Sequence, residues 1–404
     1  MSGLAAPGLA IVETHPVQYH APVYRCVQQR FGIPVTAIYG SDFSIAGGLD
    51  REFGVRFAWD TDLLSGYRAC FLRRVDRGGR GSARAVSAHG LGRALAALAP
   101  AAVMLCGYAS SFYAHAFLQA WRHRVPILFR AETTDHAVAR NAMKRRARAT
   151  VLRALYARCA RLLYVGARSY QHFRDLGCSE HRLVFSPYCV DVAAFRAGET
   201  ERVALREAVR RQLGVADGRT VLLFVGKLVA RKGPDLLLDA VRPVAPATGD
   251  RPVVVFVGDG ASREALRTRG GNGGAVDVRF VGFRNQAELS PFYHAADLLV
   301  LPSRRGETWG LVVNEALAHG VPCVVSDAVG CVPDLIRSGT TGEVFRADSV
   351  EDLRAALGRA ARLIGRREIR IACRAVVAAY GIEEAAAGIA AAFQAAAAAP
   401  RVVV

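Results

Sequence analysis

Two of the three lysines in this chain lie five residues apart in one short segment. This segment is the first candidate for a ligand-binding or catalytic site. Lys227 and Lys232 belong to Gly226–Gly233, directly after the apolar run Val221–Val225, and the other basic residues are Lys144 and 50 arginines. Lysine binds phosphate as a mobile point charge, so a strand that ends in glycine before two lysines suits a diphosphate. The alternative interpretation is that both lysines are ordinary surface residues in water. Two clustered lysines in a chain whose other basic residues are nearly all arginine favour the phosphate site.

A second segment, Phe256–Gly260, also follows an apolar run and contains glycine. Gly258 and Gly260 would let a ligand approach the backbone closely, although Gly-Asp-Gly is also an ordinary turn.

The third segment carries two glutamates separated by seven residues. Glu307 lies in a loop after the apolar run Leu298–Leu301, and Glu315 lies just over one turn inside a helix that we expect to begin near Gly310 or Leu311. Amides at a helix start favour an anion. Glu307 beside them could accept hydrogen bonds from sugar hydroxyls, and Glu315 could hold a ribose diol or be a first-turn carboxylate only.

The elements that must position these residues alternate along the chain. Short apolar runs predict strands, and longer helical stretches separate most of them, which is typical of parallel sheets covered on both faces. The predicted strands are 9–13, 34–39, 102–106, 126–130, 161–165, 183–185, 220–225, 252–257, 278–281, 298–301, 322–326 and 342–344. Predicted helices include 90–97, 142–159, 235–241, 286–296, 311–319 and 350–365.

This rhythm runs twice, so we predict an α/β fold of two Rossmann-like, doubly wound domains that face a cleft. The predicted domains are 1–190, 191–381 and a C-terminal helix, 382–404, returning to the first domain. Ligands of open α/β sheets bind beyond the carboxyl ends of the strands, and each segment above follows a predicted strand.

Composition narrows the function classes. With 404 residues, 52% of them hydrophobic, the chain can form two or three cores. The net charge of +18 invites a nucleic-acid interpretation. The arginines are spread along the chain, however, and neither zinc-finger spacing nor an RNP-like motif is present, so we expect no nucleic acid as partner.

The nine cysteines are scattered without a C-x-x-C pair, which predicts reduced thiols in a cytoplasmic protein. No apolar run of about 18 residues is present, so we expect no membrane-spanning segment and no signal peptide.

The second half resembles glycosyltransferase family 4 (group 1), retaining enzymes of the GT-B fold. The resemblance rests on the basic pair in Gly226–Gly233, the spaced glutamates, the run Ala318–Asp327, the segment Gly330–Ile336 with Gly339 and Gly342, and the passage Pro187–Phe195. Cys189 stands where family members usually have glycine, and Lys227 where most have arginine.

The resemblance implies a role for each matched residue. Lys227 and Lys232 would hold the diphosphate of a nucleotide sugar, and Glu307 would contact the transferred sugar; these three are the predicted catalytic residues. Donor binding would involve Gly226, Gly258, the amides of Trp309, Gly310 and Leu311, and Glu315 on the ribose, with Phe283 and Arg284 flanking the base.

The first half begins with a His-Pro-x-Gln-Tyr stretch, similar to a bacterial branch of the family that lacks the usual glycine-rich loop. His15, Gln18 and Tyr19 would then lie at the cleft, either on the acceptor side or near the donor phosphate; a His-Pro turn before a helix is the alternative. After strand residues 126–129, Arg130 or Glu132 stands where the family often has a histidine. They would face the acceptor or form a structural ion pair.

Two other features point elsewhere. Asp60 and Asp62 form an Asp-x-Asp, the metal site of the GT-A fold, but we interpret them as a loop near the acceptor or a helix cap, with no metal. The basic stretch 140–161 has helical apolar spacing and is interpreted as a surface helix; peripheral contact with an anionic membrane is the alternative.

The sequence therefore predicts a metal-independent retaining glycosyltransferase that needs no cofactor besides its nucleotide-diphosphate sugar. The acceptor could be a small molecule, a glycan or a lipid-linked glycan. A nucleotide-sugar epimerase or phosphorylase of the same fold is the alternative, followed by a basic nucleic-acid-binding protein.

Overall fold

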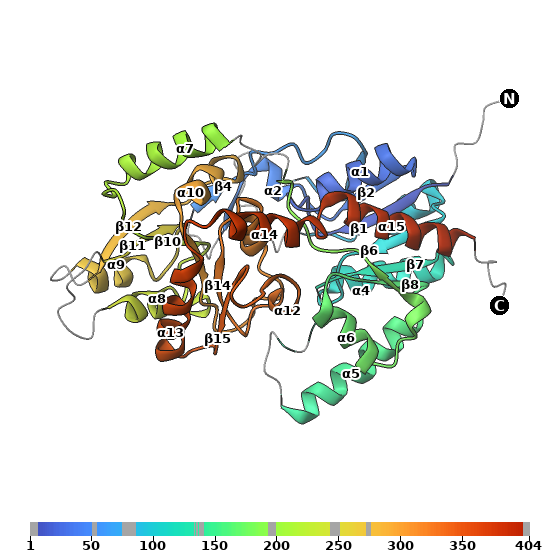
Figure 1. Ribbon diagram of the computed structural model, residues 1–404. Coiled ribbons are helices and arrows are strands. Elements are labelled where there is room, and N and C mark those ends of the chain that lie inside the picture. The colour runs from blue at the N-terminus through green and yellow to red at the C-terminus, as the bar shows by residue number, and fades with distance from the viewer. Residues whose placement is uncertain are drawn as a thin grey trace.

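The structure, a computed structural model, contains two parallel β-sheets in two α/β domains joined side by side (Figure 1). It describes residues 7–50, 55–74, 86–132, 134, 136, 141–192, 199–242, 251–271 and 276–398. Arg140, with which the basic stretch begins, lies outside these residues. The predicted class, two Rossmann-like domains, is confirmed.

The N-terminal sheet has seven parallel strands in the order β5-β2-β1-β6-β7-β8-β9. Their bounds are β5 (Arg68–Phe71), β2 (Val35–Tyr39), β1 (Leu9–Glu13), β6 (Ala102–Leu105), β7 (Ile127–Arg130), β8 (Arg161–Tyr164) and β9 (Leu183–Phe185). A separate antiparallel pair joins β3 (Gly48–Asp50) to β4 (Val55–Phe57). The sequence did not predict β3, β4 or β5, because each is short and carries no clear apolar run.

Both faces of this sheet are buried, which explains the continuous apolar runs. In β1, Leu9 and Ile11 pack in one core cluster, whereas Ala10 and Val12 pack in another. Successive strand residues point to opposite faces, so a strand covered on both sides needs apolar residues at every position.

The C-terminal sheet has six parallel strands in the order β12-β11-β10-β13-β14-β15. Their bounds are β12 (Asp277–Gly282), β11 (Val253–Val257), β10 (Val221–Val225), β13 (Leu298–Leu301), β14 (Cys323–Ser326) and β15 (Gly342–Phe345). From the central strand β10 the chain first forms β11 and β12 on one side. It then returns to form β13, β14 and β15 on the other side. The carboxyl ends of β10 and β13 flank this reversal, where ligands bind in open α/β sheets.

Helices cover both sheets. In the N-terminal domain they are α1 (Ala21–Phe31), α2 (Phe43–Ala46), α3 (Leu91–Leu98), α4 (Ser111–Arg122), α5 (Ala142–Ala157) and α6 (Ala167–Asp175). The C-terminal domain has α7 (Glu199–Gln212), α8 (Pro234–Val241), α9 (Arg263–Gly271), α10 (Ser290–Ala295), α11 (Leu311–Ala318), α12 (Val332–Leu335), α13 (Val350–Ala360) and α14 (Arg367–Ala378). Short 3-10 turns η1, η3, η4 and η5 lie at 180–182, 230–232, 286–288 and 361–363.

The last helix, α15 (Ile382–Ala397), crosses back to the N-terminal domain and packs beside α1 (Figure 1). Its small residues allow a close approach: a Cβ on Gly388 would lie 1.9 Å from the carbonyl oxygen of Phe185. Both sheets lie inside the predicted ranges, but the exact domain boundaries stay predictions.

One helical stretch, Arg367–Ala397, is long and apolar enough to cross a membrane by length and composition. This differs from the expectation that no such segment exists. The stretch includes the apolar face of α15, where Ala386, Ile389 and Ala390 belong to the N-terminal core cluster. A core helix passes the same test, so the stretch is weak support for a membrane span.

Candidate functional site

The lysine segment and the glutamate loop meet at the carboxyl ends of β10 and β13. Lys232, at the end of η3, forms an ion pair with Glu307, whose Oε2 also accepts a hydrogen bond from Ser303 Oγ at 3.1 Å. Both members of the pair are more than four-fifths buried. The structure therefore brings together the predicted phosphate ligand and the predicted sugar ligand, and it adds Ser303, which sequence reasoning missed.

The loop after Glu307 leads into the start of α11. Gly310 is its N-cap with φ +100°, a conformation that favours glycine, and an added Cβ would lie 2.9 Å from Val329. The Trp309 side chain is buried and donates from Nε1 to Asn314 Oδ1 at 2.9 Å. Only the main chain of Trp309 is thus available to a ligand, together with the amides of Gly310 and Leu311 at the helix start.

Glu315 is buried inside α11 and is held by two tyrosines. Tyr293 Oη donates to Oε2 at 2.5 Å, and Tyr19 Oη donates to Oε1 at 3.0 Å. Burial raises the pKa of Glu315 to about 7, although both tyrosine hydrogen bonds oppose this rise. Tyr293 could not be distinguished from a core tyrosine in the sequence, because it lies in an apolar helix.

Glu315 also lines a cavity of about 120 Å³ between the domains. The cavity walls include Val225, Gly226, Val257, Gly258, Phe283, Arg284, Leu289 and Val312 from the C-terminal domain, and Gln18, Tyr19 and Trp59 from the N-terminal domain. Gly226 and Gly258 therefore share one cavity with Glu315 and with the pair expected to flank the base, whereas Gly310 does not line it. A Cβ on Gly258 would lie 2.0 Å from the Gly226 carbonyl oxygen, so only glycine fits there.

The residues of the His-Pro-x-Gln-Tyr stretch lie in two different environments. His15 Nδ1 lies 2.9 Å from Thr14 Oγ1 and its ring lies against Phe43, and burial lowers its pKa. Gln18 and Tyr19 instead line the cavity that holds Glu315. Both residues lie where the two domains meet, and their acceptor-side role stays a prediction.

Arg130 is buried and serves the connection between the domains. It donates to Ser186 Oγ at 3.0 Å and to the Pro187 carbonyl oxygen at 2.7 Å, and it lies over the Tyr188 ring. An arginine engaged in this way positions the inter-domain passage, and its acceptor-facing role stays a prediction.

Glu132 lies in the cleft near the glutamate loop. Burial raises its pKa, the Thr308 hydrogen bond opposes the rise, and the charge of Glu307 adds to it. Of the two residues predicted after β7, Glu132 is thus the one that faces the candidate site.

The N-terminal domain contributes a pair that the sequence analysis did not select. Glu13, the last residue of β1, accepts a hydrogen bond from His20 Nδ1 at 2.6 Å, immediately before α1. Burial alone would raise the pKa of Glu13, but the charge and hydrogen bond of His20 bring it below its ordinary value. Glu13 and His20 are seven residues apart and flank the turn between a predicted strand and the following helix. That spacing could have marked them in the sequence as a possible pair at the cleft.

The Asp-x-Asp residues have structural partners. Asp62 Oδ1 accepts from the amides of Leu64 and Ser65, both at 3.1 Å, and Asp60 Oδ2 accepts from the Ala287 amide at 3.3 Å. Asp62 thus caps a turn and Asp60 bridges the domains. Across the described residues there is no group of three or more His, Cys, Asp or Glu placed to hold a metal ion.

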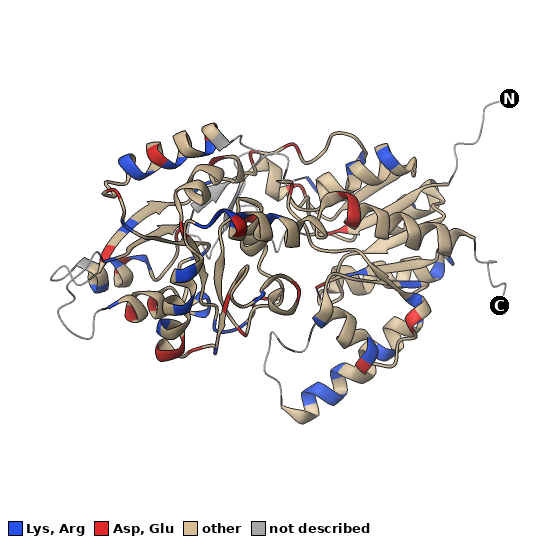
Figure 2. Ribbon diagram, in the orientation of Figure 1, with Lys and Arg blue, Asp and Glu red and all other residues tan. Residues whose placement is uncertain are grey.

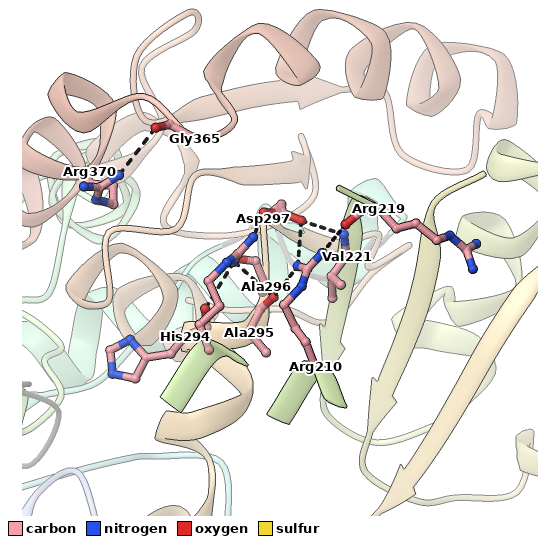
Figure 3. A network of polar contacts seen from close by, with 10 residues as sticks. Arg210, Arg219, Val221, His294, Ala295, Ala296, Asp297, Gly365 and Arg370 are labelled. Carbon is pink, nitrogen blue, oxygen red and sulfur yellow. Dashed lines mark hydrogen bonds and ion pairs between the residues drawn. The ribbon is translucent and has the colours of Figure 1, made fainter. Parts of the chain in front are cut away.

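A larger cavity, of about 780 Å³, lies at the opposite edge of the C-terminal sheet. There Arg206 and Arg210 form ion pairs with Asp297. Figure 3 shows Asp297 between Arg210 and Val221, whose amide donates to Asp297 Oδ2 at 2.7 Å. Asp297 precedes β13 and Val221 begins β10, so this cavity adjoins the amino ends of the strands. These arginines donate hydrogen bonds to the last carbonyl oxygens of α10 and so connect that helix to the sheet. The cavity is separate from the cleft between the domains.

Comparisons with known proteins match part of the chain to one family of enzymes. Residues 206–367 match the family described as Glycosyl transferases group 1. The D-inositol 3-phosphate glycosyltransferase of Geodermatophilus obscurus is 38% identical over 202 residues, which are 48% of this chain and 42% of that protein. Its counterpart from Actinosynnema mirum is 36% identical over 197 residues, 46% of this chain and 45% of that protein. The matches thus span less than half the length of these curated relatives.

Solved structures share the fold over nearly the whole chain. Anabaena Alr3699/HepE in complex with UDP and glucose has a TM-score of 0.67 at 16% identity, covering 96% of this chain and 99% of that one. Sucrose-phosphate synthase from Thermosynechococcus elongatus has a TM-score of 0.69 at 18% identity, covering 96% and 98%. At such identities the likeness concerns the two-domain fold alone.

Proposed function

Because residues 206–367 match the family described as Glycosyl transferases group 1, we propose that this protein is a retaining, metal-independent glycosyltransferase. It moves a sugar from a nucleotide-diphosphate sugar to an acceptor hydroxyl. The observation that carries the proposal is the cluster of Lys232, Glu307 and the start of α11 at the carboxyl ends of β10 and β13. Anabaena HepE was solved with UDP-glucose, which supports a nucleotide sugar as donor class.

The cluster supplies what departure of a nucleoside diphosphate requires. Lys232 has three N–H donors, so it can bind a phosphate oxygen while it stays paired with Glu307. The amides at the start of α11 add donors on the same edge, and Lys227 adds a second cation. Negative charge that develops on the leaving phosphate is therefore stabilised without a metal ion.

The sugar lies beside Glu307, and its acceptor enters from the N-terminal domain. Glu307 accepts hydrogen bonds from sugar hydroxyls and faces the positive charge that develops on the anomeric carbon. The departing phosphate takes the acceptor proton on the same face, which gives retention. The Glu13–His20 pair lies at the carboxyl end of β1, where it can orient an acceptor hydroxyl.

The experiment that tests this proposal has two steps. A panel of nucleotide sugars is first screened for thermal stabilisation, because a ligand that binds the native state raises the melting temperature by mass action. The stabilising donor is then offered to a library of hydroxyl acceptors, and the anomeric configuration of the product is read by NMR. Inverted product would refute retention, and diphosphate release without any acceptor would favour the epimerase or phosphorylase alternative.

For the acceptor we propose a polyol or glycan hydroxyl in the cytoplasm. The relatives named above act, by their names, on D-inositol 3-phosphate, which makes phosphorylated cyclitols the first acceptors to assay.

The basic helix α5 supports a further proposal, contact with an anionic bilayer. Met143 and Val151 are exposed by 75% and 64%, beside the exposed Arg145, Arg146 and Arg153. Figure 2 shows basic residues along this helix at the outer end of the N-terminal domain. We expect the protein to sediment with vesicles of anionic lipid at low salt, and a variant with these arginines changed to glutamine to sediment less. Equal sedimentation of both proteins would leave α5 an ordinary surface helix.

A further inference from the structure

We propose that Gln18 and Gln286, one from each domain, form the pair that selects the base of the nucleotide. The inference deepens the proposed function and rests on it, because it needs a nucleotide in the cleft. Neither residue follows the strand-and-glycine pattern that marked the donor site.

The two glutamines separate adjoining cavities between the domains. Both line the cavity of about 120 Å³ that contains Glu315, and both also line a second cavity of about 180 Å³. The lining of the second cavity includes the polar residues Arg25, Thr61 and Asp191. Gln18 and Gln286 therefore lie where the two cavities adjoin.

Each glutamine presents an unused hydrogen-bonding atom in this position. Gln18 is 6% exposed and Gln286 is 8% exposed, and the Oε1 atom of each is buried without a hydrogen-bond partner in the described part of the chain. Buried amide oxygens are rarely left unpaired in native proteins, because the loss of hydration is costly. Two such atoms from different domains in one place indicate a site built for a polar ligand edge.

The rest of the lining of the first cavity suits the base of a nucleoside. Val225, Val257 and Leu289 provide apolar walls of the kind that a flat ring fills, and Trp59 closes the cavity from the N-terminal side. Glu315 on the same cavity wall accepts hydrogen bonds from a ribose diol. A base between these walls presents its polar edge to the two amides, each of which can accept or donate.

The two domains are tied together next to this pair. Asn285 Nδ2 donates to the Ala58 carbonyl oxygen at 2.8 Å, and the Ala287 amide donates to Asp60 at 3.3 Å. Because Gln286 lies between these two contacts, the base edge is read only when the domains meet. A base that cannot pair with both amides leaves a buried polar atom unsatisfied, which is the strongest form of discrimination available to a binding site.

The test compares ligands with and without a base. Dissociation constants for UDP, ADP, GDP, CDP and inorganic diphosphate are measured by calorimetry for the wild type, Gln18→Leu and Gln286→Leu. Gln171→Leu, an exposed position on α6, is the matched control. Lys232→Ala provides the opposite case, because it removes a phosphate ligand and leaves the base pocket unchanged. Melting temperatures of all variants verify folding.

We expect the wild type to prefer one nucleoside diphosphate over the weakest by at least about tenfold. Gln18→Leu and Gln286→Leu should reduce that preference to within about threefold while inorganic diphosphate binds as before, and Gln171→Leu should change neither. Lys232→Ala should weaken all five ligands and keep the preference. Selectivity that survives in both glutamine variants, or a wild type without selectivity, would overturn the inference alone. Failure of every nucleoside diphosphate to bind the wild type would instead refute the proposed function.

Discussion

Tyr19 of the N-terminal domain donates a hydrogen bond to Glu315 of the C-terminal domain, with 3.0 Å between Oη and Oε1. The two residues are 296 positions apart in the chain, and the bond lies inside the cavity that also holds Gly226 and Gly258. Closure of the two domains and the ionisation of one buried carboxyl group are therefore coupled at the candidate donor site.

The raised pKa of Glu315 predicts a pH dependence of stability. The unfolded carboxyl group has its ordinary pKa near 4.5, whereas burial raises the folded value to about 7. Between these values the folded chain binds more protons than the unfolded chain, so the free energy of unfolding falls as pH rises from about 4.5 to 7. We expect urea denaturation at several pH values to give a smaller fall for Glu315→Gln than for the wild type. Parallel profiles for both proteins would show that Glu315 does not titrate in this window.

Removal of the Lys232 charge should mainly lower turnover. Lys232→Ala is expected to reduce turnover by about 10²-fold or more, typical of losing one preorganised charge donor at a developing anion. Lys144→Ala is the control, because Lys144 is exposed on α5 and is the only other lysine besides Lys227. Steady-state rates with a saturating donor check this, and near wild-type turnover of Lys232→Ala would remove the basis of the phosphate assignment.

The two glutamates should separate kinetically. Glu307→Gln is expected to lower turnover more than nucleotide affinity, because Glu307 lies on the loop beside Lys232, where the sugar is transferred. Glu315→Gln should mainly weaken nucleotide binding, because Glu315 lines the cavity with the apolar walls. Interactions made more strongly in the transition state affect turnover, and uniform binding affects the Michaelis constant.

Both constants for the donor, together with the affinity for free nucleoside diphosphate, check this separation. The reverse pattern would mean that the two roles are assigned the wrong way round, and no change in either variant would move the site elsewhere.

Transfer should continue in excess chelator. Two lysines and the start of α11 stabilise the leaving phosphate in the proposed mechanism, so no divalent cation has a role there. Initial rates of sugar transfer measured with and without EDTA test this prediction, and we expect them to be equal. Loss of activity in EDTA that manganese or magnesium restores would refute the prediction. Asp60 and Asp62 would then be the first candidates for metal ligands.

Much of the fold followed from the sequence because parallel strands buried on both faces need unbroken apolar runs. Runs such as Val221–Val225 and Leu298–Leu301 matched β10 and β13 to the residue or nearly so. The short edge strand β5 (Arg68–Phe71) was missed, because its residues are only partly buried and carry no such run. The helix predicted over 286–296 is divided into η4 and α10, with Pro291 in the first turn of the second.

By itself the sequence predicted the candidate donor residues, because glycines, lysines and glutamates directly follow strands whose carboxyl ends must meet at one edge. Only the tertiary structure decided what crosses between the domains. It brought Tyr19 to Glu315, turned Arg130 to the carbonyl oxygen of Pro187, and aligned Gln18 with Gln286. These contacts join residues far apart in the chain, and their geometry depends on how two separately folded sheets pack. No local spacing or propensity encodes that packing.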